Sequence, residues 1–341
     1  MKRILFIGGP GNLSEHAMTH LLEKTENKIA VFTLPESPDK GFAGKVEFFR
    51  GNRDNESELL QVIENYKPQI IVDTVCFLPA QAEMIARAAQ GKVEQFVFIS
   101  TCDVYGYPLS TLPMPENGKW VKTNSPYAEN KRLCEEVFQS YYSKGTLPLT
   151  IIRPSYSIGN EFFLDFFARD NGVRLMPRLK ACKPVFVPGD GTALMHVSAA
   201  YNTGRMIGNV VACYKTIGKS YTCGHNTFMT QNSYIKLFAD AIGVEANIVH
   251  IPYDLLHKTG WKEINESIME DLTRHSVAFS MDAFKADFPD FKWEKTLEEV
   301  ARDYVKFNEA RGYFKPVNDE IFEDRLIRAW NKATLNFKDL L

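Results

Sequence analysis

Short apolar runs alternate with segments of helical period along the first half of the chain. Six runs typical of buried strands lie at 3–7, 28–34, 46–49, 69–75, 95–100 and 149–154. Between them, apolar residues recur at a spacing of three or four, as at Leu13, Ala17 and Leu21, which predicts helices with one buried face. Alternating strands and helices indicate an α/β protein with a doubly wound, parallel sheet of the Rossmann type.

The pattern loosens after residue 155, where prolines become frequent. A strand followed by a helix is predicted around 194–212, and one more strand at 245–253. Later helices are predicted at 230–242, 296–310 and 318–335. The sequence therefore predicts two interleaved lobes: a first lobe over 1–160, to which about 190–225 return, and a smaller α/β lobe formed by 161–189 and 226–341.

Composition excludes several classes of protein. Hydrophobic residues make up 45% of the 341 and charged residues 24%, which is typical of an ordinary globular protein. Forty Lys and Arg against 42 Asp and Glu leave a net charge of −2, so nucleic acid is an unexpected partner. The six cysteines are scattered without metal-like spacing, which favours a reducing, cytoplasmic compartment. The apolar run after Lys2 and Arg3 is too short for a signal peptide or a membrane span.

The first strand runs into a glycine-rich turn followed by an amphipathic helix. The turn reads Gly8-Gly9-Pro10-Gly11-Asn12-Leu13, with Ser14 where a third glycine might stand. Glycines let the backbone approach a pyrophosphate, and the helix N-terminus offers unpaired N–H groups with a partial positive charge. The turn therefore predicts a dinucleotide site that includes Gly8, Gly11, Asn12 and Leu13, although a tight strand-to-helix connection is the alternative.

The next two strand ends leave the choice of dinucleotide open. The second strand ends at Thr33, where an NAD-binding protein usually has an acidic residue for the ribose. Thr33 would not repel a 2′-phosphate, yet no arginine follows at once to bind one, so NAD and NADP both remain possible. Asn52, Arg53 and Asp54 follow the third strand and could contact adenine. The alternative is a polar turn in which Asp54 caps the next helix.

A Tyr and a Lys stand four residues apart in the helix predicted after Pro126. Tyr127 and Lys131 therefore lie on one helix face. The fifth strand ends in Ser100-Thr101-Cys102-Asp103-Val104-Tyr105-Gly106, and Tyr127 follows Thr101 by 26 residues. A Tyr-x-x-x-Lys pair is expected about once by chance in a chain of this length. The pair is therefore interpreted as a functional motif only because it follows this strand end.

Together, the glycine turn, the Ser-Thr-x-Asp-Val-Tyr-Gly strand end, the Tyr-x-x-x-Lys helix and Arg153-Pro154-Ser155 resemble the extended short-chain dehydrogenase/reductase family, which includes nucleotide-sugar epimerases, dehydratases and reductases. The resemblance implies that Tyr127 is the catalytic acid/base for a substrate hydroxyl. Lys131 would lower the Tyr127 pKa and bind the nicotinamide ribose, and Thr101, with Ser100 as the fallback, would hold the substrate oxygen. It also implies an NAD or NADP cofactor, a small-molecule substrate of the nucleotide-sugar class bound in the second lobe, and a homodimer.

Departures from the family pattern bear on the reaction and the substrate. Cys102 and Asp103 stand where dehydratases of the family carry Asp and Glu, so 4,6-dehydration is less expected than oxidation, reduction or epimerisation, with Asp103 a possible further catalytic group. Tyr156 stands at the family's usual Asn, where it could contact the substrate. Basic residues that could bind a nucleotide diphosphate, or form a solvated loop, are Arg169, Arg174, Arg178, Lys180 and Lys183.

Three further points remain open. His16 and His20 have metal-ligand spacing but no third ligand nearby, so we interpret them as surface residues and expect no metal. The alternative to an enzyme is an NAD(P)-binding regulator or RNA-binding protein on the same fold. Residues that could form a dimer face, or equally the core, are Met84, Ile85, Ala88, Val137 and Phe138.

Overall fold

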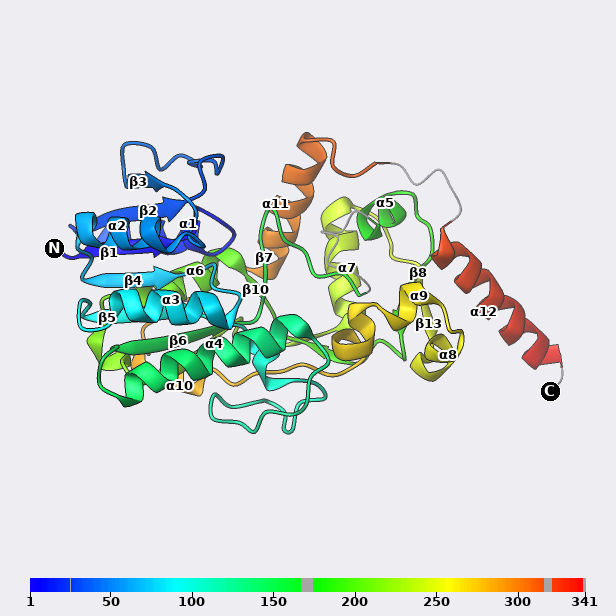
Figure 1. The fold of residues 1–341 in the computed structure, drawn as a ribbon. Coiled ribbons are helices and arrows are strands. Elements are labelled where there is room, and N and C mark those ends of the chain that lie inside the picture. The colour runs from blue at the N-terminus through cyan, green and yellow to red at the C-terminus, as the bar shows by residue number, and fades with distance from the viewer. Residues whose placement is uncertain (25, 167–173, 316–320, 340–341) are drawn as a thin grey trace.

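The protein is built around a parallel sheet whose seven strands lie in the order β11-β6-β5-β4-β1-β2-β3 (Figure 1). The computed structural model describes residues 1–24, 26–166, 174–315 and 321–339. The strands of the sheet are β1 (Arg3–Ile7), β2 (Lys28–Thr33), β3 (Glu47–Arg50), β4 (Ile70–Asp73), β5 (Gln95–Ile99), β6 (Leu149–Pro154) and β11 (Ser220–Cys223). This sheet confirms the predicted Rossmann-type α/β fold and all six predicted strands.

The seventh strand, β11, was not predicted as a strand. It has only four residues, Ser-Tyr-Thr-Cys, which lack the apolar run that marks the other strands. It pairs in parallel with β6, and Ser220 lies opposite Ile151. Pairing with a strand that is distant in sequence therefore supplies the structure that the local pattern does not indicate.

Helices cover both faces of the sheet, which explains why the strands read as continuous apolar runs. Leu5 and Ile7 of β1 pack into a cluster with α2, α3 and α4, whereas Ile4 and Phe6 pack on the opposite face with α1 and α6. All four side chains are buried. The bounds of these helices are α1 (Ser14–Lys24), α2 (Glu56–Tyr66), α3 (Pro79–Ala89), α4 (Pro126–Ser143) and α6 (Ala200–Val210).

Helices α1 and α6 pack closely because α6 has glycines at the contact. A Cβ atom at Gly204 would lie 2.5 Å from the Cβ atom of His16, and one at Gly208 would lie 2.7 Å from Cδ2 of His20. The two histidines thus share a face of α1, but His20 is only 3% exposed. The prediction that both are surface residues is therefore wrong for His20, because this face packs against α6.

Most of the remaining described elements form smaller sheets and helices beyond the carboxyl edge of the main sheet (Figure 1), whereas α10 packs against β11 of that sheet. Strand β7 pairs with β10, β9 with β12, and β8 with β13. The bounds of these strands are β7 (Tyr156–Ile158), β8 (Val185–Pro188), β9 (Leu194–Met195), β10 (Val197–Ala199), β12 (Met229–Thr230) and β13 (Ile248–Ile251). The helices are α5 (Leu175–Lys180), α7 (Gln231–Ile242), α8 (Tyr253–Lys258), α9 (Lys262–Asn265), α10 (Asp282–Asp287), α11 (Leu297–Ala310) and α12 (Phe322–Asp339). Short helical turns are η1 (Cys102–Tyr105), η2 (Tyr214–Thr216) and η3 (Met269–Thr273).

Most elements predicted after residue 155 are present. The helices predicted at 230–242 and 296–310 are α7 and α11, and the strand predicted at 245–253 contains β13. The region predicted as strand and helix at 194–212 contains β9, β10 and α6. The helix predicted at 318–335 corresponds to α12, which continues to Asp339, while its first predicted residues lie outside the described ones.

The five residues considered for a dimer face divide between the core and its margin. Ile85, Ala88 and Phe138 are buried in the cluster under α3 and α4, so these three belong to the core. Met84 and Val137 pack against the same cluster and stay partly exposed. A homodimer through this face would therefore rest on Met84 and Val137.

No helix in the described part of the chain is long and apolar enough to cross a membrane.

Candidate active site

The glycine turn after β1 adopts a geometry that only glycine allows at its first position. Gly8 has a φ of +106°, and a Cβ atom there would lie 2.4 Å from Oγ1 of Thr74. At Gly11, by contrast, the nearest atom to an added Cβ would be Oγ of Ser14, at 3.7 Å. The surface in front of Gly11 is thus open. The turn fits a bound pyrophosphate, because its backbone can be approached closely.

Side chains of the helix start hold the turn in shape. Oγ of Ser14 accepts a hydrogen bond from the backbone N–H of Gly11 and donates one to the carbonyl oxygen of Gly9, both at 2.8 Å. Ser14 therefore cross-links the turn from the position where a third glycine might stand. The Asn12 amide donates to the carbonyl oxygen of Ser157 at 2.7 Å, so the Asn12 side chain joins the turn to β7. A cofactor would meet the backbone of Asn12.

Arg50 lies beside Thr33, and the sequence did not lead us to expect an arginine there. Thr33 is buried at the end of β2 and lies opposite Arg50 of β3. The Arg50 guanidinium donates to the carbonyl oxygen of Ser37 at 2.8 Å and pairs with Asp39. The signal in the sequence was Arg50 at the end of the third apolar run. An arginine had been looked for only just after Thr33, at the end of the second run.

The turn after β3 divides its predicted residues between two roles. Arg53 is buried and pairs with the fully buried Asp73 of β4 at 3.2 Å, so its guanidinium is committed to the protein interior rather than to adenine. Asp54 accepts a hydrogen bond from the Gln81 amide at 2.7 Å. The cap of α2 is Asn55, so the alternative in which Asp54 caps that helix is also wrong. Asn52 stays exposed.

Lys131 lies where the carboxyl ends of two central strands meet. Its ammonium group donates to the carbonyl oxygens of Cys76 and Ile99, both at 2.8 Å. These bonds use two of the three N–H donors, so one can still meet a cofactor hydroxyl. Burial lowers the pKa of Lys131, against the opposing effects of Cys76 and Asp73.

Phe77 joins Lys131 and Tyr127, and sequence reasoning missed it. Its ring centroid lies 4.8 Å from Nζ of Lys131 and 6.5 Å from the centroid of the Tyr127 ring. The Phe77 side chain is 45% exposed, which is unusual for an aromatic residue beside a buried ammonium. Tyr127 itself is half-buried in the first turn of α4, whose cap is Ser125. The signal for Phe77 was its position just after a predicted strand.

Thr101 and Ser100 follow β5 but have different surroundings. Oγ1 of Thr101 accepts the N–H of Asp103 at 3.1 Å and caps η1, which leaves its own proton free to be donated. Ser100 donates to Glu135 at 2.5 Å inside a buried ion pair between Glu135 and Arg153. Ser100 is therefore held in the interior, and this placement favours Thr101 over the fallback as the residue that meets a substrate.

Two tyrosines bind the Asp103 carboxylate. Tyr156 and Tyr107 donate to the same oxygen, Oδ1, at 2.6 and 3.0 Å, and their hydroxyls also contact each other. Burial raises the pKa of both phenols well above 10, so both remain protonated donors. Tyr156, at the position of the family's usual Asn, thus holds Asp103 in place.

The basic residues predicted to bind a diphosphate contact the C-terminal helices instead. Arg178 is 0% exposed and pairs with Asp324 at 2.9 Å and Glu323 at 3.4 Å. The Arg174 guanidinium lies 5.0 Å from the centroid of the Phe322 ring. The prediction that Arg178 binds substrate is therefore corrected: the residue anchors the start of α12 in the interior. Arg169 lies outside the described residues.

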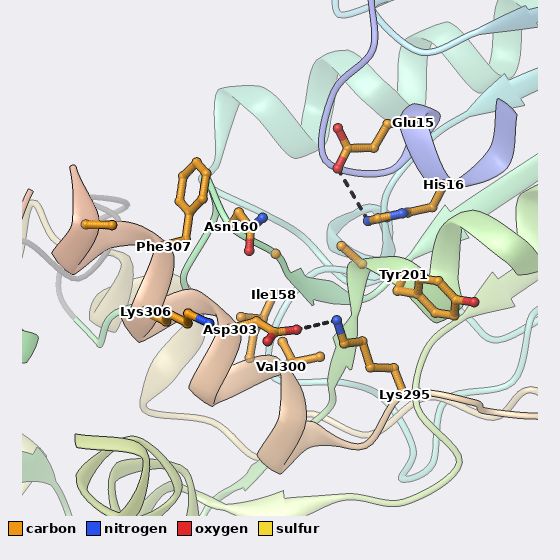
Figure 2. A pocket seen from close by; sticks show the side chains of 13 residues that line it. Glu15, His16, Ile158, Asn160, Tyr201, Lys295, Val300, Asp303, Lys306 and Phe307 are labelled. Carbon is orange, nitrogen blue, oxygen red and sulfur yellow. Dashed lines mark ion pairs between the residues drawn. The ribbon is translucent and has the colours of Figure 1, made fainter. Parts of the chain in front are cut away.

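Two cavities lie near these groups. The larger, about 340 Å³, lies between α1, α6 and α11, where His16 contacts Glu15 at 3.4 Å and Lys295 pairs with Asp303 (Figure 2). Burial lowers the pKa of His16 to about 4, which keeps it neutral. The smaller, about 160 Å³, is lined by Asp103 and by neighbours of Tyr127 on α4. The described lining of the larger cavity includes none of the predicted catalytic residues.

These features define a class of protein. A parallel sheet of Rossmann type, a glycine turn after its first strand, and a Tyr-x-x-x-Lys helix whose lysine contacts the ends of β4 and β5 are the architecture of a dinucleotide-binding short-chain dehydrogenase/reductase. A comparison with protein families makes this specific. Residues 4–201 match the model of the NAD dependent epimerase/dehydratase family. The chain belongs to that family, which confirms the predicted resemblance.

Individual relatives are distant. The chain is 25% identical over 176 residues to UDP-glucose 4-epimerase of Rhizobium meliloti, a match that covers 47% of this chain and 53% of that protein. It is also 25% identical over 183 residues to human dTDP-D-glucose 4,6-dehydratase, covering 46% and 52%. The chain thus spans about half the length of the curated relatives it matches.

Solved structures share the fold over most of the chain. The structure of dTDP-glucose 4,6-dehydratase from Bacillus anthracis in complex with NAD matches with a TM-score of 0.70 at 19% identity, over 91% of this chain and 97% of that one. UDP-glucose 4-epimerase from Thermotoga maritima with UDP-glucose matches with a TM-score of 0.67 at 18% identity, over 91% and 99%.

Proposed function

We propose that the protein is an NAD(P)-dependent oxidoreductase or epimerase that acts on a hydroxyl group of a nucleotide sugar or a similar hydroxylated substrate. The observation that carries this proposal is the arrangement at the carboxyl edge of the sheet. Lys131 donates to the carbonyl oxygens of Cys76, just after β4, and of Ile99, the last residue of β5. Phe77 joins Lys131 to Tyr127, and Thr101 lies two residues after β5. The glycine turn lies at the same edge, because β1 pairs in parallel with β4.

The roles of the side chains follow from their chemistry. The Tyr127 phenol would accept or return the proton of the substrate hydroxyl, and Thr101 would donate a hydrogen bond to the same oxygen as charge develops on it. Lys131 would bind the ribose hydroxyl of the cofactor with its remaining N–H donor and favour the ionised form of Tyr127. When bound, the nicotinamide supplies or accepts the hydride.

The cofactor would be held by the glycine turn and the strand ends beside it. Gly8, Gly11 and the backbone of Asn12 and Leu13 would contact the pyrophosphate, and Thr33 the ribose of the adenosine half. The family is NAD dependent by its description, and neighbouring structures contain NAD. Arg50 lies opposite Thr33, on the neighbouring strand, and could pair with a 2′-phosphate, so titration of Arg50→Gln with both dinucleotides would measure its part in the choice.

The groups beside Thr101 favour oxidation, reduction or epimerisation over dehydration. The Cys102 thiol is buried and donates to the carbonyl oxygen of Arg153 at 3.1 Å, and burial raises its pKa well above 9. Such a thiol is a poor acid for expelling hydroxide. Asp103 accepts two phenolic hydrogen bonds at Oδ1, so this carboxylate oxygen is already engaged by Tyr107 and Tyr156. Dehydratases are nevertheless among the relatives.

The test is the substitution Tyr127→Phe, which removes one hydroxyl from the site. We expect turnover of a nucleotide-sugar substrate, followed by formation of the product, to fall by about 10²–10⁴-fold. Cofactor affinity should change by less than about twofold, because the phenol contributes little to binding the dinucleotide. Tyr142→Phe, on the same helix and half-buried, is the matched control and should leave turnover unchanged.

Turnover retained in Tyr127→Phe would contradict this mechanism. The dinucleotide that the purified protein releases on denaturation, identified by mass spectrometry, gives a second reading. Stoichiometric NAD would support an epimerase that regenerates its cofactor, and uptake of NADPH by an empty site would support a reductase. A protein that binds neither would instead be the non-enzymatic alternative, for which salt-dependent RNA binding is the measurement.

A further inference from the structure

The ammonium group of Lys131 is almost completely enclosed, although the proposed cofactor has to reach it. Only 2% of the residue is exposed. Two sides of the ammonium group are occupied by the carbonyl oxygens of Cys76 and Ile99, each 2.8 Å away. The rings of Phe98 and Phe77 cover it further, with centroids 4.9 and 4.8 Å from Nζ. A ribose hydroxyl can therefore come within hydrogen-bond distance of Lys131 only after one of these groups moves.

Three of the four groups are fixed in the protein interior. Phe98 belongs to β5, is fully buried, and packs against the Phe138 ring with centroids 4.8 Å apart. Ile99 ends the same strand, which pairs with β6 at that residue. Cys76 is fully buried next to Cys134. Because protein interiors are closely packed, these surroundings hold all three groups in place.

The Phe77 ring is the exception, because it lies at the surface. Phe77 is 45% exposed, so its side chain can change rotamer towards solvent without leaving a cavity in the core. Its backbone stays anchored, since the N–H of Phe77 donates to Oε1 of Gln81 at 2.8 Å. Rotation of the ring would therefore uncover Lys131 without disturbing the carbonyl oxygen of Cys76 that holds the ammonium group.

We propose that Phe77 controls the access of the dinucleotide to Lys131. The inference rests on the proposed function, because it assumes that Lys131 binds the nicotinamide ribose. Without cofactor, the Phe77 ring lies over the ammonium group, and the attraction between a cation and the face of an aromatic ring favours this position. The cofactor binds the form in which the ring has rotated away, so its apparent affinity and association rate are reduced to the fraction of molecules that are open.

Removal of the ring tests this inference. The probes are NADH and NADPH, mixed in a stopped-flow fluorimeter with protein that charcoal treatment has freed of bound dinucleotide. Phe77→Ala should bind the preferred dinucleotide about tenfold faster than the wild type, because the site is then open in every molecule. Phe77→Tyr keeps a ring over the ammonium group and should keep the slow rate. Phe307→Ala, which removes an exposed phenylalanine from α11 instead, is the matched control and should associate at the wild-type rate.

A second measurement needs no cofactor. Trace acetylation with acetic anhydride, followed by peptide mass spectrometry, measures how accessible each lysine is. Lys131 should be acetylated about tenfold faster in Phe77→Ala than in the wild type, because the ring no longer covers it. Lys144 is exposed at the end of the same helix and should react equally fast in both proteins.

The possible outcomes separate this inference from the proposed function. Binding by Phe77→Ala of a dinucleotide that the wild type does not bind would support the inference. It is overturned alone if both proteins bind at rates within about twofold of each other, if Phe77→Tyr binds as fast as Phe77→Ala, or if acetylation of Lys131 is unchanged. Absence of binding in both proteins would overturn it together with the proposed cofactor site.

Discussion

At the scale of single residues, a buried ion pair fixes the end of β5, next to Thr101. Arg153 forms two hydrogen bonds with Glu135, at 3.0 and 2.6 Å, and also donates to the Tyr105 hydroxyl. Ser100 donates to the same Glu135 carboxylate. The strand end before Thr101 is thus fixed by an ion pair that is shielded from water, which keeps the Thr101 hydroxyl in one place.

Removing one charge of this pair should be costly. Glu135→Gln leaves the Arg153 guanidinium buried without a counter-charge, so the free energy of unfolding should fall by about 3–5 kcal/mol, measured by urea denaturation. Glu136→Gln, at the exposed next position of α4, should change it by less than about 0.5 kcal/mol. A loss below about 1 kcal/mol in Glu135→Gln would show that water reaches the pair.

At the scale of elements, the start of α1 depends on how closely α6 approaches it. The turn that carries Gly11 leads into α1, and the backbone oxygen of Leu13 would lie only 2.5 Å from a Cβ atom at Gly204. The three atoms nearest to a Cβ atom at Gly208 all belong to the side chain of His20, at 2.7 to 3.1 Å. The position of the predicted cofactor turn is therefore coupled to the packing of two helices that are distant in sequence.

Replacing each of the two glycines by alanine in turn should show which of the two helix contacts is the tighter one. Gly204→Ala forces α6 away from a backbone atom, so stability should fall by about 1–3 kcal/mol, and NAD affinity should weaken because the turn moves with α1. Gly208→Ala meets a side chain that can rotate, so it should cost less. Thermal unfolding and NAD titration measure both effects. Equal stability of the two variants would contradict the assignment of the tighter contact to Gly204.

At the scale of the whole molecule, a buried histidine joins three segments of the chain. Nδ1 of His196 accepts the backbone N–H of Phe279 at 3.1 Å, and its Nε2 lies 2.7 Å from the carbonyl oxygen of His225. This arrangement requires a neutral ring with its proton on Nε2. A second proton on Nδ1 would face the N–H of Phe279 and break the contact.

Acid should therefore destabilise the protein through this residue. Burial lowers the pKa of His196 to about 4, below the 6.5 of an unfolded histidine, so its contribution is complete above about pH 6.5 and is lost as pH falls towards 4. The loss should reach about 3 kcal/mol in urea unfolding. His196→Gln should flatten the dependence, whereas the exposed His257→Gln should keep it. An equally steep dependence in His196→Gln would assign the effect to other groups, such as His20, whose pKa burial also lowers to about 4.

Much of the fold could be predicted because its signals are local. The central strands of the main sheet have both faces buried, so β1 and its neighbours β2 and β4 carry runs of consecutive apolar residues, and in the helices between them apolar residues recur every three to four positions. The Tyr127 and Lys131 spacing and the glycine turn are equally local. Strand β11 escaped prediction because its identity comes from pairing with β6, a partner about seventy residues earlier.

The sequence by itself determined the Rossmann-type sheet, the glycine turn and the chemical groups of the site, since each depends on neighbouring residues and on backbone sterics. Only the tertiary structure decided how the charged residues are used. Arg53 and Arg178 look like ligand-binding residues in the chain, yet they pair with Asp73 and with Glu323 and Asp324. A buried charge requires a partner, and that partner is supplied by whichever segment the fold brings beside it, however distant in sequence.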